Sequence, residues 1–216
     1  MTETLHKASQ YLCAAAKSYL EHKADDSHTS LEWLPELQAL VTHPLGAFGD
    51  YQLALNFSSF SLEFLDANMD VVDSLYLENA QHVSIVNWIG ETAMNLEIGE
   101  LYTFDLHYEL PYDNFGEDYI IPEPDWNEIE RLGDLRTLAN ESIAYTLEVF
   151  GIEAPIRVWP HHFDTGAVIA LNKDATRSVG LGMAIADSMV PEDYFYVSAW
   201  SHDESLALVD MEPLPV

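Results

Sequence analysis

The chain has 216 residues, of which 37 are acidic and 8 are basic, and its formal net charge at pH 7 is −29. This charge argues against binding to nucleic acid or to an anionic membrane surface, because both partners require a basic face. An apolar fraction of 48% is too high for a disordered acidic polymer. The single cysteine, Cys13, excludes an internal disulfide framework and a cysteine-rich zinc module.

No apolar run approaches the ~18 residues of a membrane span, and the acidic first residues do not resemble a secretory signal. We therefore expect a soluble, cytoplasmic protein. No linker rich in Gly or Ser divides the chain, so residues 1–216 are predicted to form one domain. Cys13 has no cationic neighbour in sequence that would lower its pKa, so it is interpreted as an inert, packed thiol.

The eight basic residues all lie outside residues 24–130. The carboxylates of this stretch therefore either lie on a solvated surface or pair with arginines such as Arg131, Arg136 and Arg157. A cation-binding surface is the functional alternative. The acidic segment 113–118 supports it only weakly, because it lacks the spacing of a calcium loop and the distal Glu.

Two helices are predicted at the start of the chain. An apolar stripe from Leu5 to Tyr19 indicates an amphipathic helix over residues 3–23. A capping-box pattern at residues 29–32, followed by Pro35, then predicts a short helix that ends near residue 41.

After residue 50, apolar residues recur at every second position instead of at helical spacing, which indicates strands. Strands are predicted over residues 51–57, 60–66 and 73–78. Helical spacing returns over residues 83–96, and Gly99 is expected to close that helix. Residues 101–110 alternate again and are predicted to form a strand, with His107 and Glu109 on its polar face.

Residues 111–124 are interpreted as the longest loop, after which Asp125 is expected to cap a long helix that ends at Gly151. Four further strands are predicted over residues 155–159, 166–171, 178–185 and 193–200. Strands that come in runs favour an α+β fold with mostly antiparallel sheets covered by helices.

One segment, residues 157–166, concentrates side chains that carry chemistry. Pro160 cannot donate to a strand ladder, so regular pairing is expected to end there. On extended chain, His162 and Asp164 would share one face while His161 takes the other. His202 and Asp203, beyond the last strand, form a further imidazole and carboxylate pair.

This segment resembles part of an uncharacterised bacterial family. The resemblance rests on the Trp-Pro-His-His-Phe-Asp block at residues 159–164, on Gly180-Leu181-Gly182-Met183 and on the Tyr-rich strand 193–200 that ends in Trp200. It covers about the last third of the chain. The family has no established activity, so the resemblance implies positions and no chemistry.

Three functional hypotheses remain open. The first is a metal-binding site or metal-dependent enzyme holding a divalent ion such as zinc, manganese or iron, with ligands from His161, His162, Asp164, His107 and Glu109. In a metal-free version, His162 and Asp164 act as a catalytic acid–base pair. The structural alternative is that these histidines are hydrogen-bonded scaffold residues.

The second hypothesis is a non-catalytic module that binds a small-molecule ligand or a partner through an aromatic strand face. Its ligand-binding residues would be Arg157, Trp159, Tyr194, Tyr196 and Trp200. The third is a self-associating protein in which this face forms a homodimer interface. Both hypotheses have a structural alternative. Aromatic strand residues usually pack in a core, and Arg157 can pair with a carboxylate.

Overall fold

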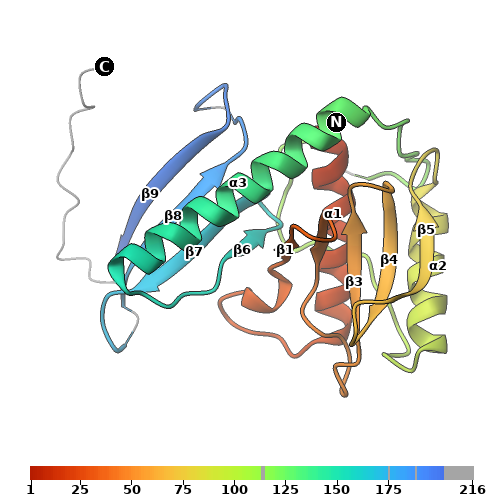
Figure 1. Ribbon diagram of the computed structural model, residues 1–216. Coiled ribbons are helices and arrows are strands. Elements are labelled where there is room, and N and C mark those ends of the chain that lie inside the picture. Colours follow the sequence, from red (N-terminus) through yellow and green to blue (C-terminus); the bar gives the residue numbers. More distant parts are fainter. Residues whose placement is uncertain (113–114, 175, 188, 202–216) are drawn as a thin grey trace.

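The computed structural model describes residues 1–112, 115–174, 176–187 and 189–201, and it contains two antiparallel sheets and three α-helices (Figure 1). The predicted α+β class is therefore confirmed. Of the helices in the described residues, none has both the length and the apolar composition that crossing a bilayer requires. His202 and Asp203 lie outside the described residues.

Helix α1, Thr2–Tyr19, is buried on all sides, since every residue from Thr4 to Ala16 is buried. The prediction of an amphipathic helix with one apolar face is wrong in this respect. Strand β3 packs on one side of the helix. Phe104 and Phe115, from the segment between α2 and α3, contact Tyr11 at ring-centroid distances of 5.1 and 5.8 Å. Because these loop aromatics cover the side of α1 that β3 leaves open, the helix is buried on all sides although it contains polar residues.

The first sheet is a five-stranded meander in the order β1-β2-β3-β4-β5. Its strands are Glu32–Leu34, Ala39–Val41, Tyr51–Asn56, Ser61–Asp66 and Val71–Tyr76. The strands predicted between residues 51 and 78 are present, with bounds shifted by one or two residues.

The short helix predicted up to residue 41 is absent, because β1 and β2 occupy its place after the 3-10 turn η1, Ser27–Thr29. Leu31 and Trp33 are buried while Glu32 is exposed, so the burial has the period of a strand. Pairing of β2 with β3 overrides the local capping-box signal.

Helix α2, His82–Asn95, confirms the predicted helix, although it ends at Leu96 rather than Gly99. Gly99 is instead required by close packing, because a Cβ atom there would lie 2.6 Å from the Tyr19 ring. Residues 101–110 keep the predicted alternation of inward and outward side chains but form no strand. They lie along α1, where Tyr102 Oη donates to the Tyr11 carbonyl over 3.1 Å, and a helix offers no ladder to pair with.

Helix α3, Trp126–Phe150, begins with Asp125 accepting from the Glu128 amide and ends at Gly151 in the left-handed conformation, as predicted. Figure 1 shows it running diagonally from above α1 across one face of the second sheet. It therefore connects the two halves of the fold.

The second sheet has the order β6-β7-β8-β9, with all pairs antiparallel. Its strands are Arg157–Trp159, Asp164–Ala170, Arg177–Ala184 and Tyr194–Ser201, which confirms the four strands predicted for this region. Leu31 and Val158 exchange two backbone hydrogen bonds of 2.8 Å, so the two sheets meet beside β6. The main core includes Val158 and Phe163 together with α1 and the first sheet.

Candidate functional site

The block at residues 159–164 forms the junction between α1 and the second sheet. Strand β6 ends at Trp159 and β7 begins at Asp164, so regular pairing stops at Pro160 as predicted. The chain between them is a tight turn with Phe163 at φ 56°, not an extended segment, and the extended-chain argument for the histidines is wrong. The Pro160 carbonyl accepts from His6 Nε2 at 2.7 Å and from Gln10 Nε2 at 2.9 Å.

Phe163, the aromatic residue of this turn, contacts an imidazole ring and a guanidinium group. The His6 ring stacks on Phe163 at 4.9 Å, and the buried Arg136 guanidinium lies 4.2 Å from the Phe163 ring centroid. Arg136 also donates to the Phe163 carbonyl and to Thr165 Oγ1. Burial lowers the pKa of His6 to about 4 and that of Arg136 to about 10. These contacts give the turn a structural role.

Asp164 is buried and its carboxylate accepts a hydrogen bond from the Tyr196 hydroxyl of β9. The Tyr196 ring lies flat across β8, because Gly182 and Gly166 are its neighbours in register. A Cβ atom at Gly182 would lie 2.6 Å from the Tyr196 ring and from the Thr165 carbonyl. Burial first, and the Asp164 charge second, raise the pKa of Tyr196. The glycine-rich strand thus allows close approach of a side chain, as its sequence indicates.

The two adjacent histidines have different environments. His161 is half-buried, with its ring 4.3 Å from His162 and 5.8 Å from Tyr108. Burial, and then the neighbouring His162, lower the pKa of His161. His162 is exposed. With Asp164 bound to Tyr196, the structure does not bring His162 and Asp164 into a hydrogen-bonded pair.

The residues of the aromatic hypothesis are largely engaged by other protein groups. Arg157 Nη1 lies 2.9 Å from Glu32 Oε2, Trp159 lies 6.3 Å from the His161 ring, and the Tyr194 hydroxyl donates to Asp187 over 2.8 Å. Trp200 is 69% exposed, with its indole nitrogen donating to Ser198. Only Trp200 of the three strand aromatics presents an open surface among the described residues.

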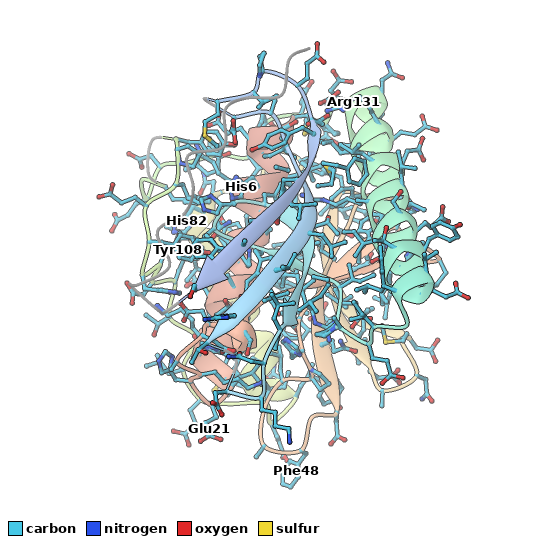
Figure 2. The ribbon with its side chains drawn as sticks, turned by 90° about the vertical axis from the view of Figure 1, so that its left-hand side faces the viewer. His6, Glu21, Phe48, His82, Tyr108 and Arg131 are labelled. Carbon is cyan, nitrogen blue, oxygen red and sulfur yellow. The ribbon has the colours of Figure 1, made fainter. Side chains whose placement is uncertain are left out.

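A different set of histidines forms the group best suited to hold a metal. His22, Asp26 and His28 each offer a ligand atom, and these atoms lie within 4.8 Å of one another. Within the described ranges, no other group of three His, Cys, Asp or Glu residues meets this criterion. The group follows the C-terminal end of α1, which Glu21 marks at the lower edge of Figure 2.

Local backbone geometry brings these three side chains together. Asp26 has a left-handed φ of 55° and precedes the 3-10 turn η1, which reverses the chain so that His28 faces His22. The two imidazole rings are 5.1 Å apart and nearly perpendicular. His28 is buried whereas His22 is exposed. The ligand group therefore has one fixed side and one side open to solvent.

Burial lowers the pKa of His28, with His22 contributing in the same direction and Asp26 opposing. Its ring is therefore neutral near pH 7, which is the form that binds metal. The Lys23 amide donates to Nδ1 of this ring over a long distance of 3.4 Å. This bond is weak enough to be exchanged for a ligand.

His107 extends the group from the loop that crosses α1. Its Nε2 donates to Asp26 Oδ2 over 3.0 Å. The hydroxyl of its neighbour Tyr108, labelled in Figure 2 beside His82, donates to Gln10 Oε1 over 2.7 Å and lies 3.2 Å from Cys13 Sγ. Cys13 is buried, and burial raises the pKa of its thiol, which agrees with an inert cysteine.

Of the residues predicted as metal ligands, His107 contacts this group, while Glu109 is exposed on the same loop. The charges of both Asp26 and His107 act on the pKa of His161, so the 159–164 turn lies near this group. Sequence reasoning missed His22 and His28 because they occur in a loop without periodicity. Their spacing around Asp26 was the available signal.

No protein-family model matches the chain, and comparison with the curated proteins and with the solved structures found no match either. The resemblance of residues 159–164 to an uncharacterised bacterial family stays a prediction.

Proposed function

We propose that this protein binds one divalent transition-metal ion through His22, Asp26 and His28. The observation that carries the proposal is the convergence of these three ligand atoms within 4.8 Å of one another. Two imidazoles and one carboxylate are a ligand set that zinc and other first-row metals use in proteins. The site lies on the strongly acidic chain of net charge −29, which attracts cations.

The geometry needs only a small adjustment. Ligand atoms around a tetrahedral zinc ion lie about 3.4 Å apart, given bonds of about 2.1 Å. Contraction from 4.8 Å therefore requires movements of about 1 Å, which rotation of the exposed His22 and half-buried Asp26 side chains can supply. His28 would stay in place because it is buried.

His107 supports this arrangement as a positioning residue. A hydrogen bond from its ring to the Asp26 carboxylate would fix the orientation of that ligand, as outer partners of metal ligands commonly do. Three protein ligands leave a coordination position for water, which is the arrangement of hydrolytic zinc sites. A metal-dependent enzyme is therefore an extension of the proposal, whereas metal binding is its core.

Titration with Co²⁺, followed by visible absorption, tests the proposal because cobalt replaces zinc and reports on its ligands. The untagged wild-type protein is expected to saturate at one Co²⁺ per chain. We expect His28→Ala and Asp26→Asn to lose at least tenfold in affinity, and His107→Ala to lose less. Zn²⁺ should displace the cobalt and remove the spectrum.

His162→Ala is the matched control, because it removes an exposed histidine of the 159–164 block and leaves the three ligands intact. It should bind Co²⁺ like the wild type. Loss of binding in His162→Ala, with His28→Ala unaffected, would contradict the proposal and favour the ligand set predicted from the sequence.

A further inference from the structure

Residues 101–112, which we call the strap, run along α1 without belonging to a helix or a strand. Among the residues that the structure describes, the strap makes one hydrogen bond between backbone groups, from the Asp105 amide to the Thr103 carbonyl over 3.1 Å. It therefore has no ladder that ties it to either sheet. Its attachment to α1 depends on side chains.

Two of these attachments lie on either side of His107. Lys17 Nζ donates to the Asp105 carbonyl over 2.8 Å, and Tyr108 Oη donates to Gln10 Oε1 over 2.7 Å. A segment that is held by a few side-chain bonds opens at a lower free-energy cost than the packed elements beneath it. We therefore expect the strap to open while the sheets stay folded.

The strap covers Cys13, the single cysteine of the chain. The thiol is fully buried, and Tyr108 Oη lies 3.2 Å from Sγ. Thr29, which follows the ligand residue His28, is a second hydrogen-bonding neighbour of the thiol. Cys13 thus contacts both the strap and the loop that carries the metal ligands. It can react with a soluble reagent only when one of these covers moves away.

His107 connects the strap to the metal site. Its Nε2 lies 3.0 Å from Asp26 Oδ2, and the two side chains are 35% and 44% exposed. We propose that the metal site controls the strap. An ion held by His22, Asp26 and His28 fastens the strap to α1 through His107, and loss of the ion lets the strap open and uncovers Cys13. This inference rests on the proposed metal site.

Ordering of the Asp26 side chain carries the coupling. In the metal-free protein this half-buried carboxylate retains rotational freedom, which a hydrogen bond from His107 has to remove. A bound ion has already fixed the carboxylate, so the same hydrogen bond then costs less entropy. Coupling between two such events is reciprocal and typically changes an equilibrium about 5–150-fold.

Reaction of Cys13 with iodoacetamide, followed by intact mass, tests the proposal because the chain has no other thiol. The full-length wild-type protein is compared without metal and with bound Zn²⁺, and the zinc content is measured on the same samples. We expect bound zinc to slow the reaction at least about fivefold. In His107→Ala, loaded at saturating zinc, the reaction should be equally fast with and without the ion.

Two further variants of the strap serve as matched controls. The amide of His107→Gln can donate to Asp26 in place of Nε2, so this variant should restore the slowing by zinc. Glu109→Gln changes an exposed side chain two residues away and should behave like the wild type.

The outcomes separate the coupling from the metal site. Equal slowing in the wild type and in His107→Ala would overturn the coupling, as would no slowing in a wild-type protein that contains zinc. A wild-type protein that takes up no zinc would overturn the metal site, and the coupling with it. Strong near-ultraviolet absorption of the Co²⁺ form would identify Cys13 as a thiolate ligand and would also overturn the proposal.

Discussion

Buried polar side chains make the contacts that hold the 159–164 turn in place. Arg136 and His6 both contact the Phe163 ring, and each also donates to a backbone carbonyl of the turn. Removing Arg136 takes away the side-chain donor of the buried Phe163 carbonyl, which is costly in a low-dielectric interior, whereas removing His6 leaves the Pro160 carbonyl with its bond from Gln10 alone. These two residues therefore determine how firmly the second sheet is attached to α1.

Replacing Arg136 tests this role. Arg136→Ala should lower the free energy of unfolding by about 3–5 kcal/mol, and Arg136→Lys should not restore it, because one ammonium cannot reproduce the two-donor fork and the stacking. Arg157→Ala serves as the control, since the Arg157–Glu32 pair is partly open to solvent and should contribute at most about 1 kcal/mol. Urea unfolding measures both; equal losses for Arg136 and Arg157 would contradict this assignment.

The lowered pKa of His6 predicts a specific pH dependence. Its pKa is about 4 in the folded protein and about 6.5 in the unfolded chain, so the unfolded state takes up a proton first as pH falls. The stability from neutral His6 is complete above pH 6.5 and is lost between pH 6.5 and 4. At pH 5 the loss should be about 2 kcal/mol.

His6→Gln isolates this contribution, because its amide can still donate to the Pro160 carbonyl. Its unfolding free energy should be below that of the wild type at pH 7.5, and the difference should narrow by about 2 kcal/mol at pH 5. The other histidines and the carboxylates titrate in both proteins and cancel in the comparison. A difference that is constant with pH would show that His6 is not buried as a neutral ring.

Periodicity predicts those elements whose partners lie next to them in sequence. Helices α2 and α3 and strands β3–β9 follow their apolar patterns, because hairpins and helix caps are local. The pattern fails where the covering element is distant. Residues 101–110 alternate because they lie on α1, almost 100 residues earlier in the sequence. Residues 39–41 pair with β3 despite the capping-box pattern that precedes them. The site at His22, Asp26 and His28 depends on a turn, which periodicity does not reveal.

Two glycines of β8 test the packing of the second sheet. Gly182→Ala should destabilise the protein by about 1–3 kcal/mol, since the added Cβ meets the Thr165 carbonyl and the Tyr196 ring. Gly180→Ala is the matched control, because its Cβ meets only the movable Ser198 hydroxyl. It should cost much less. Thermal unfolding of the two variants provides the comparison, and equal destabilisation would argue against a fixed Tyr196 ring.

The whole molecule carries a large negative charge and has few cations to neutralise it. Two long-range pairs, Lys17 with Asp105 and Arg157 with Glu32, and one local helix pair, Arg131 with Glu128, partly compensate the stretch from residue 24 to 130. The sequence shows the shortage of cations but cannot show which carboxylates they reach. Most acidic side chains are left to repel one another through solvent.

Stability should therefore rise with salt. The Debye length shortens from ~30 Å at 0.01 M to ~8 Å at 0.15 M ionic strength, which screens this repulsion. We expect the melting temperature to increase over that range of sodium chloride. A flat or falling curve, measured by calorimetry, would mean that the carboxylates are well separated or effectively paired.

Metal content after equilibrium dialysis tests the central claim most directly. Untagged protein is loaded with Zn²⁺, dialysed against metal-free buffer at pH 7.5 and analysed by mass spectrometry of the elements. The account predicts about one zinc per wild-type chain and none in a variant that combines His22→Ala with His28→Ala. A wild-type protein that retains no zinc, or a double variant that retains as much as the wild type, would contradict it.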